Sequence, residues 1–199
     1  MVFYKLGYKK ELCVELGLGN DWEGILCPKD EGHRRAGRRI TELKLKLLSP
    51  CIVDFSWTFL ADIVVTDRVI QVLRKEGLTG FETKPTTIVS TLKAVDVQKL
   101  PKFWEFIVTG TGGHAHPDSG IRLKWECKAC ATERYSAYEH GIIVDETKWD
   151  GTDFFSVVEY PKYILITERA KKVIEDHNLT NVKFTPSHEL IWPELVIKP

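Results

Sequence analysis

The regular alternation of apolar and polar residues in ITELKLKLL, residues 40–48, is the clearest strand signal in the chain. Three leucines in this segment fall on one side and the lysines between them on the other, which is the period-two pattern of a strand with one buried face. TTIVSTLKAVDV, residues 86–97, and KFWEFIVTG, residues 102–110, are rich in β-branched and aromatic residues and predict two further strands. Most of the chain is therefore expected to form sheet.

A second pattern, longer than the first, occurs twice. IVVTDRVIQVLRKEGLTGFETKP, from Ile63 to Pro85, aligns without a gap with ILITERAKKVIEDHNLTNVKFTP, from Ile164 to Pro186, at an offset of 101 residues (164 − 63). The residues that coincide include Thr66 with Thr167, Arg68 with Arg169, Leu78 with Leu179, Thr79 with Thr180, and Pro85 with Pro186. The match predicts a duplicated structural unit.

Each copy has the features of a strand followed by a capped helix. A short β-branched run leads to a threonine, a favourable N-cap residue, and an acidic residue follows in the first turn. Apolar residues then recur at i, i+3 and i+4. The helix ends at Gly77 in one copy and Asn178 in the other, and both residue types tolerate the left-handed conformation of a helix C-terminus. The pattern predicts helices over residues 67–76 and 168–177, each between two strands.

These elements predict an α+β fold with mostly antiparallel strands and two helices from the duplicated strand-helix-strand unit. The 199 residues suit a single domain. We expect two lobes within it, of residues 1–100 and 101–199, each built on one copy of the unit. A repeat of this kind is a scaffold and does not by itself indicate a chemistry.

The composition narrows the classes of function. Lys and Arg together number 28, as do Asp and Glu, so the net charge is zero, whereas a nucleic-acid-binding domain usually carries a basic excess. No apolar run approaches the ~20 residues needed to cross a bilayer, and the N-terminus lacks the layout of a signal peptide. Both observations favour a cytoplasmic protein without a membrane partner. The five cysteines, an odd number, argue against a disulfide framework and leave metal binding or burial for the thiols.

Charge is nevertheless unevenly distributed along the chain. Residues 29–46 hold seven basic and three acidic residues, and residues 126–159 hold eight acidic and three basic ones. Such segregation can steer a charged partner, although two solvated faces would have the same pattern. The basic cluster from Arg34 to Arg39 keeps one alternative open, a zinc-ribbon module that binds nucleic acid.

The segment TGTGGHAHPDSG, residues 109–120, has the composition of an active site. The spacing of His114, His116 and Asp118 is used by metal-dependent hydrolases of the metallo-β-lactamase type, but those enzymes carry a further histidine where this chain has Ser119. The glycine-rich run also lacks the Lys-Ser/Thr of a phosphate loop, and the adjacent proline and aspartate favour a turn. We therefore expect a loop and turn here, in a protein that is not an enzyme, with a metal-dependent hydrolase as the weaker alternative.

The cysteine spacing is the stronger metal signal. Cys127-x2-Cys130 is half of a tetrahedral zinc site, and the upstream segment CPKDEGH has an aspartate where a second cysteine would complete another pair. The predicted ligands of a structural zinc ion, in a zinc-ribbon-like knuckle, are Cys27, Cys127, Cys130 and either His33 or Asp30. The alternative is a relic of such a site, in which the thiols serve only as small buried side chains.

The order of these motifs resembles that of the double-CXXCG motif proteins, a bacterial family that includes immunity proteins against contact-delivered toxins. The segments that carry the resemblance are DWEGILCP, SWTFLADIVVTDRVIQVLRKEGLTGFE, FIVTGTGGHAHPDS, ECKACA and DFFSVVEYPKYILITERAKKVIEDHNLTNVKF. Family members have a tryptophan before Cys-Pro-x-Cys-Gly, a His-Pro turn before a second Cys-x-x-Cys-Gly, and a terminal strand-helix-strand. In this chain the first motif is reduced to CPKDE and the second to CKACA, so Asp30 and Ala131 depart from the pattern.

The resemblance implies a function that the residues alone do not. It implies an immunity protein that binds a cognate protein toxin in the cytoplasm of the producing cell and neutralises it by stoichiometric inhibition. It also implies that HAHPDS is a structural turn ahead of the second knuckle. By position, Cys27, Cys127 and Cys130 match cysteines of the family motif.

The acidic segment is the expected contact surface for a toxin. Trp149, in DETKWDGTDFF, lies among acids and a glycine, and a tryptophan in such a loop is a candidate interface anchor, whereas the other tryptophans are expected in the core. The acidic residues that could accompany it, by mimicking a phosphate backbone if the toxin is a nuclease, are Asp145, Glu146, Asp150 and Asp153. The alternative is a solvated loop.

Overall fold

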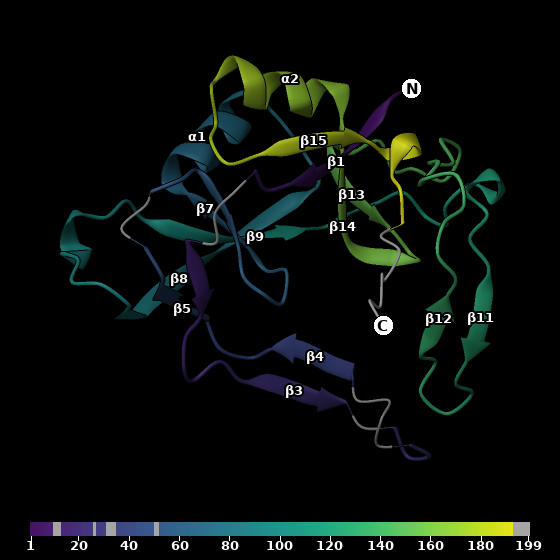
Figure 1. The fold of residues 1–199 in the computed structure, drawn as a ribbon, viewed down its shortest axis with the longest axis horizontal. Coiled ribbons are helices and arrows are strands. Elements are labelled where there is room, and N and C mark those ends of the chain that lie inside the picture. The colour runs from purple at the N-terminus through teal and green to yellow at the C-terminus, as the bar shows by residue number, and fades with distance from the viewer. Residues whose placement is uncertain (10–12, 26, 31–34, 50–51, 193–199) are drawn as a thin grey trace, which may run out of the picture.

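Most of the described elements are strands, and two α-helices accompany them, in line with the expected mostly-sheet α+β class (Figure 1). A computed structural model of the chain describes residues 1–199 except 10–12, 26, 31–34, 50–51 and 193–199. Two sheets form the body of the molecule, and two smaller two-stranded arms extend from it on the same side (Figure 1).

The first sheet has six strands in the order β2-β5-β8-β9-β7-β6. Their bounds are β2 Val14–Leu16, β5 Leu43–Leu47, β8 Phe81–Thr91, β9 Phe103–Val108, β7 Ile63–Thr66 and β6 Phe55–Trp57. All neighbours are antiparallel except β5 and β8, which are parallel. The end strands β2 and β6 approach each other, so the sheet curls into a nearly closed barrel. The three leucines of β5 are all buried and its lysines are not, which confirms the alternation seen in the sequence.

The second sheet has five strands in the order β10-β13-β14-β1-β15. Their bounds are β10 Gly110–Thr111, β13 Phe154–Val157, β14 Tyr160–Thr167, β1 Phe3–Gly7 and β15 Lys183–Pro186. β10 and β13 are parallel, and the other neighbours are antiparallel. The N-terminal strand β1 therefore lies inside a sheet whose other strands all come from the second half of the chain.

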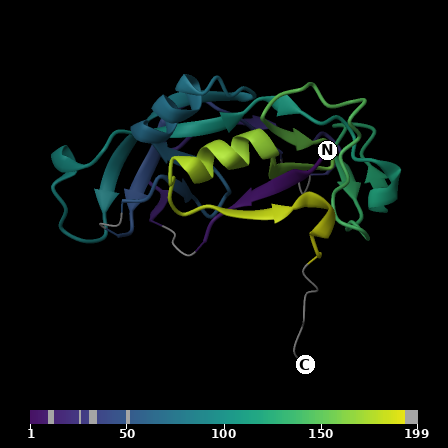
Figure 2. The same ribbon diagram turned by 90° about the horizontal axis from the view of Figure 1, so that it is seen from above.

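The two helices are α1 Asp67–Lys75 and α2 Glu168–Asp176, each one residue shorter than predicted because Glu76 and His177 are the C-caps. Each helix follows one strand, β7 or β14, and precedes another, β8 or β15. Thr167 accepts the capping hydrogen bond from the backbone N–H of Ala170. The predicted side-chain cap by Thr66 is not made; the Thr66 hydroxyl donates to the buried Asp54. Figure 2 shows α2 running alongside β1 and β15.

The arms are antiparallel hairpins. One consists of β3 Trp22–Ile25 and β4 Arg35–Arg39, and the other of β11 Leu123–Glu126 and β12 Glu133–Tyr135. Three short 3-10 helices, Val97–Lys99, Pro117–Ser119 and Ser187–Glu189, complete the described elements. The second of these is the turn predicted at HAHPDS. Among the described residues, no helix is long and apolar enough to cross a membrane.

The largest core cluster draws on both halves of the chain. It includes Phe55, Leu73 and Phe106 together with Phe154 and Ile174, each at most 3% exposed. Phe106 stacks on Phe81 with ring centroids 4.9 Å apart and meets Phe154 edge-on at 5.1 Å. The largest of the three described core clusters thus spans both regions, 1–100 and 101–199, that were predicted as lobes.

Candidate metal centre and interaction surfaces

Three cysteine thiols meet where the tips of the two arms come together. Cys27 follows β3, and Cys127 and Cys130 lie in the turn between β11 and β12. Their sulfur atoms all lie within 4.8 Å of one another, with Cys27 Sγ and Cys127 Sγ 3.7 Å apart. None of the three is in a disulfide. They form the one group of three or more potential metal ligands found among the residues that the structure describes.

The sulfur geometry fits a tetrahedral metal. Zn–S bonds of about 2.3 Å place the sulfurs of a tetrahedral site about 3.8 Å apart, close to the separation of Cys27 and Cys127. The backbone N–H groups of Lys29 (3.4 Å) and Asp30 donate to Cys27 Sγ, but burial and the neighbouring thiols Cys130 and Cys127 raise the pKa of Cys27 on balance. A hydrogen bond with the Thr132 hydroxyl (3.1 Å) lowers the pKa of the Cys130 thiol to about 6. The Thr132 contact therefore favours the thiolate of Cys130, the form in which cysteine binds metals.

The fourth ligand is the open part of this site. His33, one of the predicted candidates, lies outside the described residues. Asp30, the other, is exposed, and the described group contains only the three thiols. The structure therefore supports three of the predicted ligands and leaves the choice of the fourth as a prediction.

The two histidines of HAHPD serve the local structure. His114 Nδ1 lies 3.0 Å from Glu159 Oε1, and His116 Nδ1 accepts a hydrogen bond from the backbone N–H of Asp118. The Asp118 side chain is 75% exposed. His114, His116 and Asp118 do not form a metal-ligating group among the described residues. The contacts of the two histidines are therefore local, and the hydrolase alternative is not tested by them.

The structure describes only part of the basic cluster from Arg34 to Arg39. Arg34 lies outside the described residues. The Arg39 side chain is 10% exposed and forms ion pairs with Glu105 and, at 3.7 Å, with Asp62. Burial raises the pKa of Glu105, although the Arg39 guanidinium opposes this shift. Arg39 is thus engaged inside the molecule and does not present its charge to a nucleic acid.

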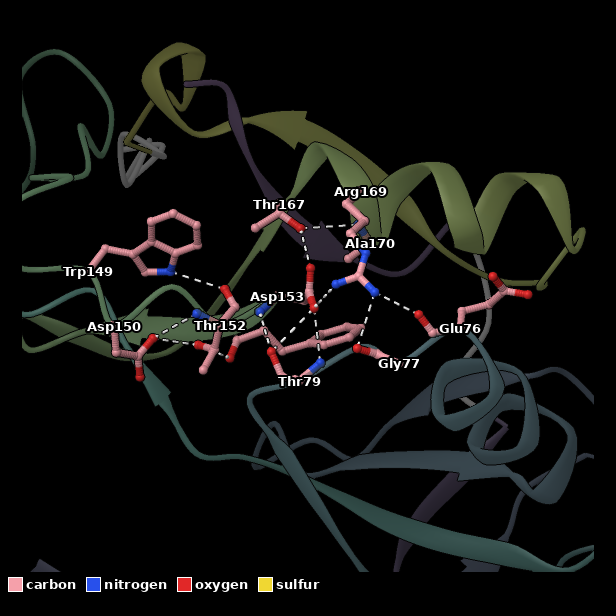
Figure 3. A network of polar contacts seen from close by, with 11 residues as sticks. Glu76, Gly77, Thr79, Trp149, Asp150, Thr152, Asp153, Thr167, Arg169 and Ala170 are labelled. Atoms are coloured by element: carbon pink, nitrogen blue, oxygen red, sulfur yellow. Dashed lines mark hydrogen bonds and ion pairs between the residues drawn. The ribbon is translucent and has the colours of Figure 1, made fainter.

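Two residues predicted to contact a partner make close contacts within this fold. Trp149 is partly buried, meets Phe3 edge-on with ring centroids 5.1 Å apart, and donates its Nε1–H to the carbonyl of Thr152 at 3.0 Å (Figure 3). Asp153 is only 4% exposed, and its carboxylate accepts several hydrogen bonds. Asp153 therefore does not present its charge at the surface, whereas a contact of the partly buried Trp149 with a partner stays a prediction.

The other acids of the segment are closer to the surface. Asp145 bonds to the Thr147 hydroxyl and pairs with Lys148, and these contacts, that of Thr147 first, lower the pKa of its carboxyl to about 2. Glu146 pairs with the N-terminal amine. Asp150 accepts from the backbone N–H of Thr111, and also from that of Thr152 (Figure 3). The three acids fix loops and remain candidates for electrostatic steering.

An exposed turn that the sequence analysis did not select has the features of an interface. Phe59 and Leu60, at the tip between β6 and β7, are 82% and 46% exposed. Backbone hydrogen bonds from Thr58 to Asp62 (3.0 Å) and from Ala61 to Thr58 (2.9 Å) close the turn, and Ala61 has a left-handed φ of 68°. In the sequence, this turn could have been recognised only from three consecutive apolar residues, Phe59, Leu60 and Ala61.

Neighbouring elements hold this turn in place. The backbone N–H of Phe59 donates to the carboxylate of Glu15 (3.3 Å), and Lys162 Nζ donates to the carbonyl of Leu60 (2.9 Å). Beside the tip lies a groove of about 410 Å³ lined by Trp22, Leu60, Ala61, Asp62 and Lys162. One wall of this groove, Trp22, belongs to the arm that carries Cys27.

Comparison with known proteins gives no independent assignment. No family model matches the chain, and no curated protein matches it. Membership of the double-CXXCG family thus stays a prediction that rests on the motifs quoted above.

Proposed function

We propose that this chain is a stoichiometric protein inhibitor, and that its partner is a cognate bacterial toxin encountered in the cytoplasm of the producing cell. The observation that carries the proposal is the exposed, tightly held turn with Phe59 at its tip. The class of partner comes from the resemblance to the double-CXXCG family. A protein of this kind acts by occupying a surface, and no catalytic step is assigned to it.

The Phe59 turn has the physical properties of an interface anchor. An aromatic side chain contributes a large apolar area, and such residues dominate the energetics of many interfaces. Ordering a flexible loop weakens binding, so a turn already fixed by hydrogen bonds to Glu15 and Lys162 loses less entropy on association. The groove beside Trp22 would bind an apolar group of the partner next to the Phe59 contact.

We further propose that zinc binds the three thiols and supports this surface indirectly. The metal would join the arm of β3 and β4 to the arm of β11 and β12 through Cys27, Cys127 and Cys130. Trp22 lies on β3, so fixing the arm also fixes a wall of the groove. In this role the ion is structural, as expected for a site built from thiolates.

Co-expression of the toxin with variants of this protein tests the proposal. Wild-type protein should protect cells in proportion to its amount, and protection should vanish when toxin is in molar excess. Phe59→Ala should weaken binding by about 2 kcal/mol, or roughly 30-fold in Kd, because the anchor is lost. Isothermal titration or surface-based kinetics with purified toxin would measure this change.

The control is Val97→Ala, which truncates another exposed apolar side chain, in the 3-10 helix at the opposite end of the body from the arms (Figure 1). It should leave the Kd unchanged within about twofold. Protection by one molecule against many toxin molecules would contradict stoichiometric inhibition. Equal binding by the wild-type protein and Phe59→Ala would remove the turn from the interface.

A further inference from the structure

The first strand of each half of the chain, residues 1–100 and 101–199, pairs within the sheet formed by the other half. β1, from the first half, lies between β14 and β15 of the second half, and β9, from the second half, lies between β7 and β8 of the first (Figure 1). In both places the visiting strand is antiparallel to both neighbours. The exchange is therefore reciprocal.

The residue register of the two exchanged strands is the same. In the second sheet, Phe3 pairs with Thr167 and Tyr4 pairs with Pro186. In the first sheet, a phenylalanine of β9 pairs with Thr66 and a tryptophan pairs with Pro85, at Phe103 and Trp104. Two consecutive aromatic residues at the start of each exchanged strand thus pair with the equivalent threonine and proline of the two repeat copies.

A pair of buried aspartates joins the halves in equivalent ways. Asp54 Oδ1 accepts from the Thr66 hydroxyl (3.0 Å), and Oδ2 pairs with Arg68 Nη1 (2.8 Å), both in its own half. Thr180 of the other half donates its backbone N–H (2.8 Å) and hydroxyl (3.0 Å) to the same Oδ2. Asp54 itself is 7% exposed, so its carboxylate depends on these donors in place of water.

Asp153 makes the mirrored set of contacts (Figure 3). Its Oδ1 accepts from the Thr167 hydroxyl (2.9 Å), and Oδ2 pairs with Arg169 Nη1 (3.1 Å) in its own half. Thr79 of the first half donates its backbone N–H (3.0 Å) and hydroxyl (3.3 Å) to Oδ2. Each aspartate is thus bound by the threonine and arginine of its own repeat copy and by the threonine of the other copy.

The arginines extend the same exchange to the helix ends. Arg68 Nη2 donates to the carbonyl of His177 (2.5 Å), and Arg169 Nη2 donates to the carbonyl of Glu76 (2.6 Å). A cation at a helix C-terminus satisfies otherwise unpaired carbonyls and interacts favourably with the helix dipole. Each helix is therefore capped at its C-terminus by an arginine from the first turn of the other helix.

We infer that the molecule is a fused, strand-exchanged dimer, in which the boundary between residues 1–100 and 101–199 is a dimer interface. The partner that this interface fits is the complementary half of a second copy of the chain. Strand exchange, the two aspartate clusters and the thiol cluster of Cys27 with Cys127 and Cys130 all cross this boundary. An exposed stretch, residues 92–94 after β8, lies shortly before this boundary and is accessible for cleavage.

The test uses the complete chain with a protease recognition sequence inserted after Lys93. After cleavage of the folded protein, the two fragments should remain together and elute at the mass of the intact chain, 22.8 kDa plus the insert. When this sample is mixed with cleaved protein tagged on its N-terminal fragment, brief mild denaturation and refolding should pair tagged fragments with untagged partners. Separation or precipitation of the fragments on cleavage would overturn the inference.

A matched pair of substitutions checks that the aspartate clusters hold the halves together. Thr180→Ala removes a hydroxyl that one half donates to Asp54 of the other, and should raise the dissociation constant of the cleaved fragments about tenfold. Gln71→Ala removes a hydrogen bond within α1, to Asp67, and should change it less than twofold. Equal effects of the two substitutions would contradict a specific interface at this position.

Discussion

At the scale of single residues, the side chains that matter most to the fold are the two buried aspartates. Neither Asp54 nor Asp153 belongs to the repeat that the sequence revealed, because their separation is 99 residues (153 − 54) and that of the repeat is 101. A gap of two residues is enough to hide them from an ungapped alignment. Their partners Thr79, Thr180 and the arginines were visible as matched positions, but nothing in the sequence said what they bind.

The first residue-scale prediction concerns the stability that these aspartates confer. Asp153→Ala should lower the free energy of unfolding by about 3 kcal/mol, because the backbone N–H and hydroxyl of Thr79 and the buried hydroxyl of Thr167 lose their acceptor. Asp54→Ala should have a similar effect, since its contacts are equivalent. Urea denaturation would measure both.

Asp118→Ala is the control for that experiment. This aspartate side chain is 75% exposed, and its removal should change the unfolding free energy by no more than about 0.5 kcal/mol. A loss below about 1 kcal/mol for both buried aspartates would show that their contacts are not stabilising.

The second residue-scale prediction concerns pH. The folded-state pKa of Asp145 is about 2, below its ordinary value of 3.8. The ionised carboxylate therefore favours the folded state. Its contribution to stability is fully present above about pH 4 and is lost as the pH falls through about 2. Carboxyl chemical shifts followed by NMR during an acid titration would give this pKa.

Thr147→Ala tests the cause of the shift. The Thr147 hydroxyl makes the largest favourable contribution to the low pKa of Asp145, so its loss should move that pKa back towards 3.8. An unchanged pKa in this variant would assign the shift to Lys148 instead.

At the scale of elements, the sequence predicted best where a pattern is local. The helices were placed to within one residue, because threonine, the acidic first turn and the Gly or Asn stop are all local signals. β5 followed from alternation within five residues. The partners of each strand were not predictable, because β1 pairs with strands at the far end of the chain and β9 inserts between β8 and the earlier strand β7. The parallel pairing of β5 with β8 likewise depends on the whole sheet.

The candidate metal site is the element-scale feature with the most direct test. Protein purified without chelator should contain about one zinc per chain, and Cys130→Ser should lose it, since two thiolates bind a structural ion poorly. Amide exchange in β3 and β11 should then quicken, while α1 and α2 stay protected, because only the arms depend on the ion. Elemental analysis and hydrogen exchange would report the two effects.

Cys13→Ser is the matched control for the metal experiment. Cys13 is 1% exposed but is not part of the thiol group, so this variant should keep its zinc. Protein that lacks zinc and is as stable as the metal-treated form would identify the three cysteines as a relic.

At the scale of the whole molecule, the proposed interaction surface around Phe59 shows which surface residues can be predicted from composition and which cannot. The acidic segment was predicted as a contact surface because charge is visible in a sequence, yet Asp153 is buried and Trp149 packs against Phe3. Phe59 was overlooked because an isolated phenylalanine in a chain with nine of them looks like a core residue. Phe59 is distinguished only by its position at the tip of a turn. The backbone of this turn is held by Glu15 at Phe59 and by Lys162 at Leu60.

The exchange of strands also has a consequence for biosynthesis. The ribosome completes residues 1–100 before it makes β9, so the first half emerges with a missing strand between β7 and β8. In the same period β1 has no sheet to join, because β14 and β15 are the last strands to be made. Pairings between such distant segments form slowly, since the chain must close long loops before any contact stabilises them. The first sheet can close once β9 has emerged, but β1 stays unpaired until β14 and β15 leave the ribosome, and chaperones have their longest access to the nascent chain during that interval.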